Sequence, residues 1–342
     1  MSHKKLRILF LGPITYNPDG TPRDQMGKLV KGFAEKDYTV FSRSQIKSKP
    51  LRLLSMLFFM LKVNTYDAVY IQSFGFLSFI FEDIVSRMAK IFRKKIVFTI
   101  RGGAFMEFAE RKSEWVKRVF SRADIITTPS VFLKKELENM NFEVHYVPNF
   151  TDLSNFQYDR SNVKPHSILW VRSFEPSYHP ELAIESFAII KKSFPEATLT
   201  MIGPDKGGLA RAKHKMQELN VEKDIRIEGY VPNNKLFKYY QNHQVFFTTT
   251  RYESFGVAIF EAASCGTPNI SVEVGEIPFI WENRHSILFA KRNAKECAKK
   301  ISELFNNPDL EERLSKNAKI NAERYSWEKI WPKWQKVTES LR

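Results

Sequence analysis

Short apolar runs alternate with helix-like segments along almost the whole chain, and this alternation constrains the fold more than any other feature. In the first part, the run Leu6–Leu11 is followed by a turn-rich segment, a helical pattern over Gln25–Glu35 and a strand-like run at Thr39–Phe41. The same order recurs over residues 68–147. Continuous apolar strands that alternate with helices are typical of a parallel sheet covered on both faces. The first part is therefore predicted to be an α/β domain.

A second alternating series runs from Ser167 to the helical pattern at Asp309–Glu323. A length of 342 residues also suits two domains of roughly 150 residues each. We predict two Rossmann-like α/β domains, over residues 1–150 and 165–324, joined by a polar linker at 151–164. Ligands of such sheets bind beyond the carboxyl ends of the strands. We therefore expect the two domains to face each other across a cleft that holds the site.

The chain is strongly basic, with 53 Lys and Arg against 38 Asp and Glu, or 53 − 38 = +15. Residues 1–150 carry 25 − 14 = +11 and residues 151–342 carry 28 − 24 = +4. Such an excess favours an anionic partner, and its position favours a membrane surface or lipid phosphate over a nucleic acid. Two Cys residues and the lack of a Cys-x-x-Cys motif exclude a disulfide scaffold and favour a cytoplasmic setting. We find no signal peptide and no apolar run of membrane-spanning length.

The most informative segment runs from Arg251 to Pro268 and follows the apolar run Val245–Phe247. We expect a helix to begin near Ser254, whose hydroxyl can cap it, and Gly256 to let a ligand approach the helix start closely. Amides at a helix start lack partners inside the helix and suit a diphosphate. The segment is therefore a candidate anion site at the end of a buried strand.

Two carboxylates flank this expected helix start. Glu253 precedes the helix and Glu261 lies inside it, so both can face one site and bind sugar or ribose hydroxyls. An ordinary capped helix with a solvated Glu is the alternative interpretation, because short motifs also match by chance. A glycosidase acid–base pair needs two carboxyls across a scissile bond. The placement of both residues beside an anion site fits nucleotide-sugar binding better.

This segment resembles the signature of glycosyltransferase family 4, in which Glu-x-Phe-Gly precedes a second Glu and a Gly-x-Pro turn. These are retaining, nucleotide-sugar-dependent enzymes with the GT-B fold of two Rossmann-like domains. The resemblance implies that a last helix, over 325–342, crosses back to the first domain. It extends along nearly the whole chain, through Val147–Asp152 with Phe156, Leu169–Arg172 with Ala183–Phe187, Gly203–Asp205, Gly229–Pro232 and Tyr325–Trp327.

The resemblance implies roles for individual residues. Glu261 would hold the ribose hydroxyls and Glu253 the hydroxyls of the donor sugar, while amides near Phe255 and Gly256 would hold the diphosphate. Arg172 would neutralise that diphosphate, which a guanidinium suits by charge and geometry; a surface ion pair is the alternative. The remaining donor-site residues that it implies are Ser254, Gly203 and Pro232.

The chain departs from the family pattern beside the expected diphosphate. The usual Lys after the Arg falls at Ser177 or Tyr178, and His179 or Lys206 are alternative sources of positive charge. Glu276 replaces the second glycine of a Gly-Gly turn. A second carboxylate near a phosphate is unfavourable unless it turns away or binds a sugar hydroxyl.

A third departure lies in the first domain, where Arg101 replaces the family's usual His. Arginine stays protonated and cannot act as a general base at neutral pH. It can stabilise negative charge that develops on a leaving diphosphate. Our hypothesis is that Arg101 binds donor or acceptor phosphate; the alternative is a structural Arg that fixes the Gly-rich loop.

Two further segments of the first domain are candidates for acceptor contacts. Gly12, Gly20 and Arg23 lie in a loop before a helix, which can approach a phosphate or an acceptor. This loop is neither a Gly-x-Gly-x-x-Gly fingerprint nor a Walker loop, so an NAD enzyme and a P-loop NTPase are not expected. The stretch Arg43–Lys62 is basic and apolar, as in helices that lie on anionic membranes. Its wide apolar surface also fits burial against the sheet.

The sequence thus predicts a retaining hexosyltransferase that moves a sugar from a nucleotide-sugar to an acceptor hydroxyl, in cell-surface polysaccharide or lipid-linked glycan biosynthesis. The protein would be cytoplasmic or peripheral on the inner membrane face. The seven His residues have no paired spacing, so we expect neither a metal nor another cofactor beside the co-substrate. The alternatives are a GT-B protein that binds without transfer and a GT-B sugar-nucleotide epimerase. A nucleic-acid partner is suggested by charge alone and is not expected.

Overall fold

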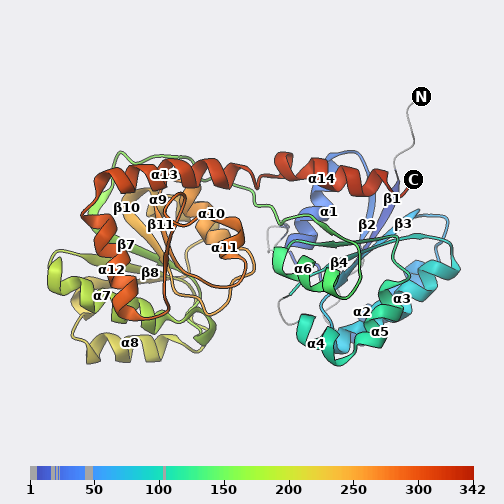
Figure 1. Ribbon diagram of the computed structural model, residues 1–342, viewed down its shortest axis with the longest axis horizontal. Coiled ribbons are helices and arrows are strands. Elements are labelled where there is room, and N and C mark those ends of the chain that lie inside the picture. The colour runs from blue at the N-terminus through green and yellow to red at the C-terminus, as the bar shows by residue number, and fades with distance from the viewer. Residues whose placement is uncertain (1–5, 17–19, 21, 23, 43–48, 103–104) are drawn as a thin grey trace. The chain divides into compact units, whose positions relative to one another are not determined.

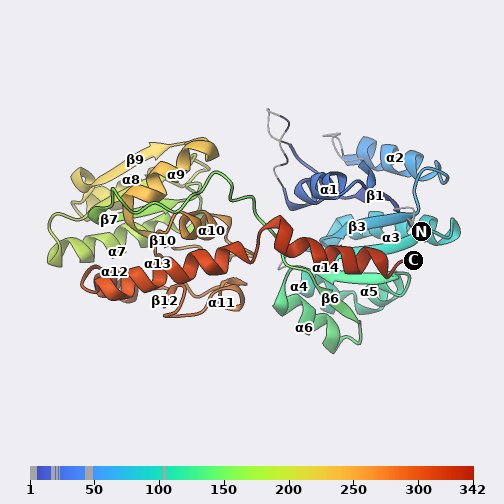
Figure 2. The same ribbon diagram turned by 90° about the horizontal axis from the view of Figure 1, so that it is seen from above.

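The computed structural model describes residues 6–342 except 17–19, 21, 23, 43–48 and 103–104. The chain forms two compact units, which we describe separately. The first unit contains Met1–Phe150 and Ile330–Arg342, and the second contains Thr151–Lys329. Each unit has one parallel sheet with helices on both faces (Figures 1 and 2).

The described residues of the first unit form six parallel strands in the order β2-β1-β3-β4-β5-β6. The strand order reverses between β1 and β3, which makes that edge the switch point where ligands of doubly wound sheets bind. The strands are β1 Arg7–Leu11, β2 Thr39–Ser42, β3 Ala68–Ser73, β4 Lys95–Ile100, β5 Ile125–Thr128 and β6 Val144–Tyr146.

Helices cover the two faces of this sheet in unequal numbers. One face packs against the helices α2 to α6, whose buried side chains form one core cluster with the strands. The other face packs against α1 and α14, where Phe33 forms edge-to-face ring contacts with Trp331 and Trp334. The helices are α1 Gln25–Glu35, α2 Lys49–Met60, α3 Phe79–Ile91, α4 Phe105–Arg111, α5 Ser113–Phe120, α6 Val131–Asn139 and α14 Trp327–Glu339.

The second unit has six parallel strands in the order β12-β11-β10-β7-β8-β9. Its switch point lies between β7 and β10, as in the dinucleotide-binding arrangement. The strands are β7 Lys164–Val171, β8 Thr198–Ile202, β9 Ile225–Gly229, β10 His243–Thr248, β11 Asn269–Val272 and β12 Leu288–Ala290.

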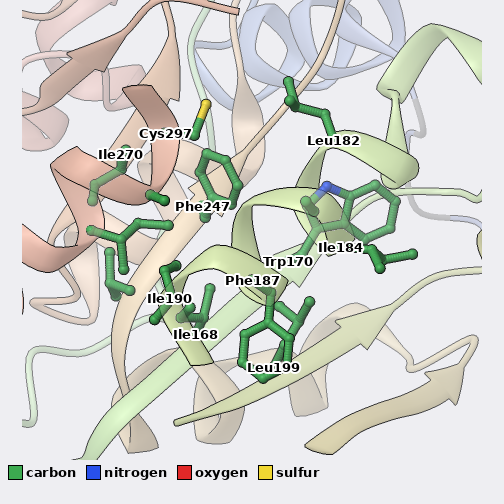
Figure 3. Packing of buried hydrophobic residues seen from close by; sticks show 14 of the residues in the cluster. Ile168, Trp170, Leu182, Ile184, Phe187, Ile190, Leu199, Phe247, Ile270 and Cys297 are labelled. Atoms are coloured by element: carbon green, nitrogen blue, oxygen red, sulfur yellow. The ribbon is translucent and has the colours of Figure 1, made fainter. Parts of the chain in front are cut away.

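Alternate residues of these strands enter two separate cores. One core contains Trp170 and Phe247 of the sheet with Phe187 of α7 and Cys297 of α12 (Figure 3). The other core lies under α9, α10 and α13 and contains Phe260. The helices are α7 Pro180–Ser193, α8 Leu209–Glu218, α9 Asn233–Asn242, α10 Val257–Ser264, α11 Ile277–Ile280, α12 Ala294–Phe305 and α13 Pro308–Glu323.

The expected fold class of two Rossmann-like domains with parallel sheets is confirmed, and two boundaries differ from our expectations. The stretch that we interpreted as a linker, 151–164, belongs to the second unit, because Phe156 is buried in its core and Lys164 already begins β7. The last helix begins at Trp327 rather than at 325, and the chain joins the first unit from Ile330 onward.

Candidate functional site

The second unit has a cavity of about 290 Å³ at the carboxyl ends of its central strands. Val171 and Arg172 line it from the end of β7, Ile202 and Gly203 from the end of β8, and Glu261 from α10. This is the side of the sheet where ligands of doubly wound folds bind. The cavity brings together four of the segments that we singled out as donor-site candidates.

Gly203 allows the ends of β7 and β8 to approach closely. A Cβ atom at this position would lie 1.8 Å from the carbonyl oxygen of Arg172. The amide of Gly203 donates to the carbonyl of Gly229 at 2.8 Å, which joins the end of β8 to that of β9. Only a glycine leaves this backbone, and with it the cavity wall, in place.

Arg172 and Glu253 form a well-shielded ion pair beside this cavity. Nη2 of Arg172 lies 2.5 Å from Oε2 of Glu253, and their side chains are 15% and 14% exposed. Oε1 of Glu253 accepts from the amides of Ser254 at 3.1 Å and Phe255 at 3.3 Å. The two candidate residues therefore contact each other. The Glu253 carboxylate binds the Arg172 guanidinium and two backbone amides, groups of the kind that were expected to hold a diphosphate.

The Arg172 guanidinium has a hydrogen-bond donor, Nε, that no described residue uses. Its Nε is buried and has no hydrogen-bond partner within the described part of the chain. The ring of Tyr178 lies 5.3 Å from its central carbon, an arrangement typical of a cation–π contact. Burial lowers the pKa of Arg172 and the Glu253 carboxylate raises it, with a net upward shift, so the guanidinium stays charged.

Glu261 is held from α9 by two hydrogen bonds. Asn233 Nδ2 donates to Oε1 at 2.8 Å and the hydroxyl of Tyr240 donates to Oε2 at 2.9 Å. Burial and the neighbouring Glu261 raise the pKa of Tyr240, so Tyr240 remains a donor. The sequence analysis did not identify either partner. Asn233 could have been inferred, because it directly follows the Gly229–Pro232 loop.

The start of α10 differs from our expectation. Ser254 does not cap the helix, because α10 begins at Val257 and Gly256 occupies the N-cap position with φ 81°. This left-handed backbone is accessible to glycine at little cost. Phe255 is a core residue whose ring stacks on Phe260 at 4.4 Å, so only its backbone can contact a ligand. Val257 and Ala258, the first residues of α10, line the cavity, whereas the amide of Ile259 already donates to the carbonyl of Gly256.

The turn after β11 fixes the backbone of Glu253. The amide of Glu276 donates to the carbonyl of Glu253 at 2.9 Å. A Cβ atom at Gly275, where φ is 56°, would lie 2.1 Å from that carbonyl oxygen. Glu276 is itself buried and does not line the cavity. The backbone amide of residue 276, which any residue other than proline would supply, thus helps to position Glu253.

The residues that replace the family's Lys take other roles. The Ser177 hydroxyl donates to Glu175 at 2.6 Å, whereas Tyr178 lines the cavity. His179 lies in the left-handed region at the start of α7, and burial lowers its pKa, which favours the neutral ring. Lys206 is exposed and does not line the cavity. In the described residues, Arg172 is the cation of this cavity.

One donor-site candidate lies just outside the cavity. Pro232 precedes α9 at its N-cap position and is not a lining residue, whereas Tyr230 and Val231 line the wall. The ring of Tyr230 is 72% exposed, so it is accessible to a flat ligand. This loop therefore borders the cavity through Tyr230 and Val231, and Pro232 as a donor-site residue stays a prediction.

In the first unit, Gly12 lies at the switch point between β1 and β3. A Cβ atom at Gly12 would lie 2.7 Å from the Cβ of Gln72, so glycine makes room for this side chain. Oε1 of Gln72 is buried without a hydrogen-bond partner among the described residues. Gly20 is exposed and Arg23 lies outside the described residues.

The first turn of α1 is already occupied by a carboxylate. Asp24 Oδ1 accepts from the amide of Gly27 at 2.8 Å, and its Oδ2 accepts from the amide of Thr15 and, at 2.7 Å, from the Thr15 hydroxyl. A phosphate in this position would meet that carboxylate. The loop that was expected to bind phosphate is therefore better suited to a hydroxyl.

Arg101 follows β4 and joins it to the end of β3 and to the segment after β6. Its amide donates to the carbonyl of Ser73 at 2.8 Å and its Nη1 donates to Oδ1 of Asn149 at 2.5 Å. Burial lowers the pKa of Arg101 to about 10, so it is protonated at neutral pH. Its Nε is buried without a partner within the described chain. These contacts fit the structural interpretation and leave the buried Nε among the donors that a ligand could use.

Residues 154–321 match the family model described as Glycosyl transferases group 1. The match covers most of the second unit and just under half of the chain. The chain is similar to the D-inositol 3-phosphate glycosyltransferase of Streptomyces bingchenggensis, with 30% identity over 47% of this chain and 37% of that protein. It is also similar to the alpha-monoglucosyldiacylglycerol synthase of Acholeplasma laidlawii, with 30% identity over 42% of this chain and 36% of that protein. The chain thus spans less than two fifths of each of these relatives.

The whole fold is similar to that of Anabaena HepE, whose crystal structure is a complex with UDP. The TM-score is 0.76 over 98% of this chain and 99% of that chain, at 14% identity. This likeness concerns the fold, which is GT-B.

No helix in the described ranges has the length and apolar character to cross a membrane. The described His, Cys, Asp and Glu side chains do not come together in threes as they do around a metal ion.

Proposed function

We propose that the protein is a retaining glycosyltransferase of family 4 that moves a sugar from a nucleotide-sugar to an acceptor hydroxyl. One observation carries this proposal: the Arg172 guanidinium, the start of α10 and the Glu261 carboxylate meet around one cavity at a switch point. A cation and a helix start suit a diphosphate, and a buried carboxylate suits ribose hydroxyls. The domain match and the UDP in the HepE complex support this assignment.

The proposed mechanism rests on positioning and on stabilisation of the leaving group. As the bond between the anomeric carbon and the diphosphate oxygen breaks, negative charge grows on the diphosphate. Arg172 stays charged and can neutralise it, together with the first-turn amides of α10. Glu253 would orient the sugar through its hydroxyls, and no protein nucleophile is assigned.

We propose that the group that receives the sugar is the hydroxyl of an acceptor that carries no phosphate at this position. Oε1 of Gln25 and Oε1 of Gln72 are buried acceptors without a partner in the described chain, and Asp24 adds a carboxylate close by. Hydroxyl groups can donate to such oxygens, whereas a phosphate dianion has no hydrogen to offer. Arg101 would then orient the acceptor or support the loop rather than act as a base.

A membrane surface is the proposed location of the acceptor. Helix α2 and the residue after it expose Leu51, Leu54, Phe58 and Leu61 at 58%, 62%, 67% and 59%. Spacings of three and four place these side chains on one helical face, while Met56 and Met60 are buried on the other. The exposed face therefore supports contact with a membrane, and the buried face supports packing against the sheet. Of its basic residues, Arg43 and Lys47 lie outside the described residues, as do the side chains of Lys49 and Arg52.

We propose a cytoplasmic protein that works at the inner membrane face on a lipid-linked glycan or a cell-surface polysaccharide. The name of the Acholeplasma relative gives a glycosylated diacylglycerol as its product, which supports a lipid acceptor here. The excess of +11 in residues 1–150 supports attraction to anionic lipids.

A donor screen tests the proposal. The protein is incubated with UDP-, GDP- and ADP-sugars and a lipid extract, and release of the nucleoside diphosphate is followed. We expect one nucleotide class to be turned over and Glu261→Gln and Arg172→Lys to lower that turnover at least tenfold. Glu312→Gln removes an exposed carboxylate of α13 and serves as the control. Equal turnover in all variants would show that the donor site is elsewhere.

The same screen separates the two alternative functions. A protein that binds without transfer retains donor binding with no turnover over any acceptor; the departures at Arg101, Ser177 and Glu276 favour this alternative. An epimerase isomerises the sugar when no acceptor is present. Either result replaces the transferase assignment.

A further inference from the structure

The Glu253 carboxylate occupies an anion site that its own segment helps to build. It contacts Nη2 of Arg172 at 2.5 Å, the amide of Ser254 at 3.1 Å and the amide of Phe255 at 3.3 Å. One guanidinium and two backbone amides are the donor set that proteins use for phosphate oxygens. The carboxylate therefore stands where a phosphate group would be held.

The backbone of Glu253 is fixed while its carboxylate can turn. The amide of Glu276 holds the Glu253 carbonyl at 2.9 Å, and Gly275 packs against the same carbonyl. Three side-chain torsions lie between this fixed backbone and the carboxylate. A diphosphate can thus displace the carboxylate without disturbing the turn.

We infer that Glu253 competes with the diphosphate for Arg172 and that this competition selects the sugar-bearing donor over the spent nucleoside diphosphate. The inference rests on the proposed function, because it assumes that the cavity beside Arg172 is the donor site. In addition to any contact with the sugar, Glu253 would thus have a second role, in ligand discrimination and product release.

The preference for the nucleotide-sugar depends on which groups surround the Glu253 carboxylate after it has left Arg172. A nucleotide-sugar brings hydroxyl groups that can donate to Glu253 after it leaves Arg172. A free nucleoside diphosphate brings no sugar hydroxyl to this position, and its greater negative charge repels the displaced carboxylate more strongly. Only a ligand that interacts better with the displaced state can shift the equilibrium toward it.

Product release follows from the same geometry. Transfer removes the sugar, so Glu253 loses its hydroxyl partners while the diphosphate still holds Arg172. Return of the carboxylate to Arg172 and the two amides restores three hydrogen bonds and favours dissociation of the diphosphate. No covalent step is involved, and the carboxylate only exchanges partners.

Binding of inorganic pyrophosphate tests the competition without knowledge of the base or sugar. Calorimetric titration compares the wild type with Glu253→Gln, which keeps the side-chain volume and removes the charge. We expect Glu253→Gln to bind pyrophosphate at least tenfold more tightly, with a similar gain for whichever of UDP, GDP and ADP binds. Affinity for the matching nucleotide-sugar should not rise by the same factor. Pyrophosphate binding that is unchanged or weaker in Glu253→Gln overturns the inference.

Two further variants separate this inference from the proposed function. Glu175→Gln removes a carboxylate that hydrogen-bonds Ser177 and controls for the general loss of negative charge. Arg172→Ala should abolish pyrophosphate binding. If it does, and Glu253→Gln brings no gain, the anion site stands and the competition is wrong. If Arg172→Ala binds like the wild type, the donor-site assignment itself is wrong. Glu253→Ala repeats the measurement should Glu253→Gln fold poorly.

Discussion

At the scale of single residues, the first unit contains a buried carboxyl group that no proposed step uses. Glu82 lies in the first turn of α3 and is fully buried. It accepts hydrogen bonds from the Ser73 hydroxyl, the amide of Phe74 at 3.3 Å and the Ser78 hydroxyl at 3.2 Å. Burial raises the pKa of Glu82 to about 7, although these hydrogen bonds oppose the shift.

This shift predicts a pH-dependent stability of the first unit. Between the ordinary pKa of 4.5 and about 7, the unfolded chain loses the Glu82 proton while the folded chain keeps it. The free energy of unfolding therefore falls as the pH rises through this window. Glu82→Gln removes this dependence and should add up to about 3 kcal/mol at pH 8 and almost nothing at pH 4. Urea denaturation at both pH values measures the difference, and equal slopes with pH in both proteins would contradict it.

A matched pair of glycines tests the close approach of β7 and β8. Gly203→Ala places a Cβ against the carbonyl of Arg172, whereas Gly207→Ala meets only the cost of its positive φ, because no atom lies within 4 Å. We expect Gly203→Ala to destabilise the second unit by roughly 1–3 kcal/mol more than Gly207→Ala. It should also weaken pyrophosphate binding, since Arg172 must move. Equal unfolding midpoints for the two variants would count against this steric role.

At the scale of elements, the chain's apolar pattern predicted nearly all strands and most helices, because strands buried on both faces read as continuous apolar runs. The pattern failed where tertiary contacts decide the outcome. Residues 151–163 are polar in sequence, yet Phe156 anchors them in the second core. Ser254 has the side chain of a cap, but the left-handed Gly256 delays α10 to Val257.

The site was predicted in part for the same reason. The family motif identified Glu253 and Glu261 because they lie close together in the sequence. It identified Arg172 because this residue directly follows the end of a strand. The pairing of Arg172 with Glu253 joins residues 81 positions apart, and no local pattern encodes it. Asn233 and Tyr240 likewise reach Glu261 from another helix.

The exposed stripe of α2 predicts binding to anionic vesicles. Leu54→Ser with Phe58→Ser removes two exposed apolar side chains, each worth about 1.5–3 kcal/mol when buried. We expect at least tenfold weaker co-sedimentation with vesicles of phosphatidylglycerol and phosphatidylcholine. Phe279→Ser with Ile320→Ser, which are 53% and 54% exposed in the second unit, is the control. If the double variant instead changes the molar mass in solution, the stripe is an interface between copies of the chain.

At the scale of the whole molecule, the first unit is built from two distant pieces of chain. Trp334 of α14 is 1% exposed and lies 6.2 Å from the rings of Phe33 and Tyr70. The Tyr70 hydroxyl lies 2.9 Å from that of Thr338. The last helix therefore completes the core of the first unit.

This division predicts that damage to α14 is confined to one unit. Trp334→Ala should destabilise the first unit by roughly 3–5 kcal/mol, the usual cost of removing a large buried ring. Calorimetry should show one shifted unfolding transition, and pyrophosphate binding by the second unit should be unchanged. Gln335→Ala, an exposed neighbour, is the control. A shift of both transitions would mean that the units unfold together.

The place of Ile330–Arg342 in the first unit also sets an order for synthesis on the ribosome. These residues are made after the whole of Thr151–Lys329, so the second unit can finish folding first. At ordinary rates of translation, roughly 10 to 40 seconds pass between the synthesis of Phe150 and that of the helix that covers Phe33 and Tyr70. During this interval the nascent first unit displays an aromatic surface, and we expect it to be a target for chaperones until the last turn of α14 emerges.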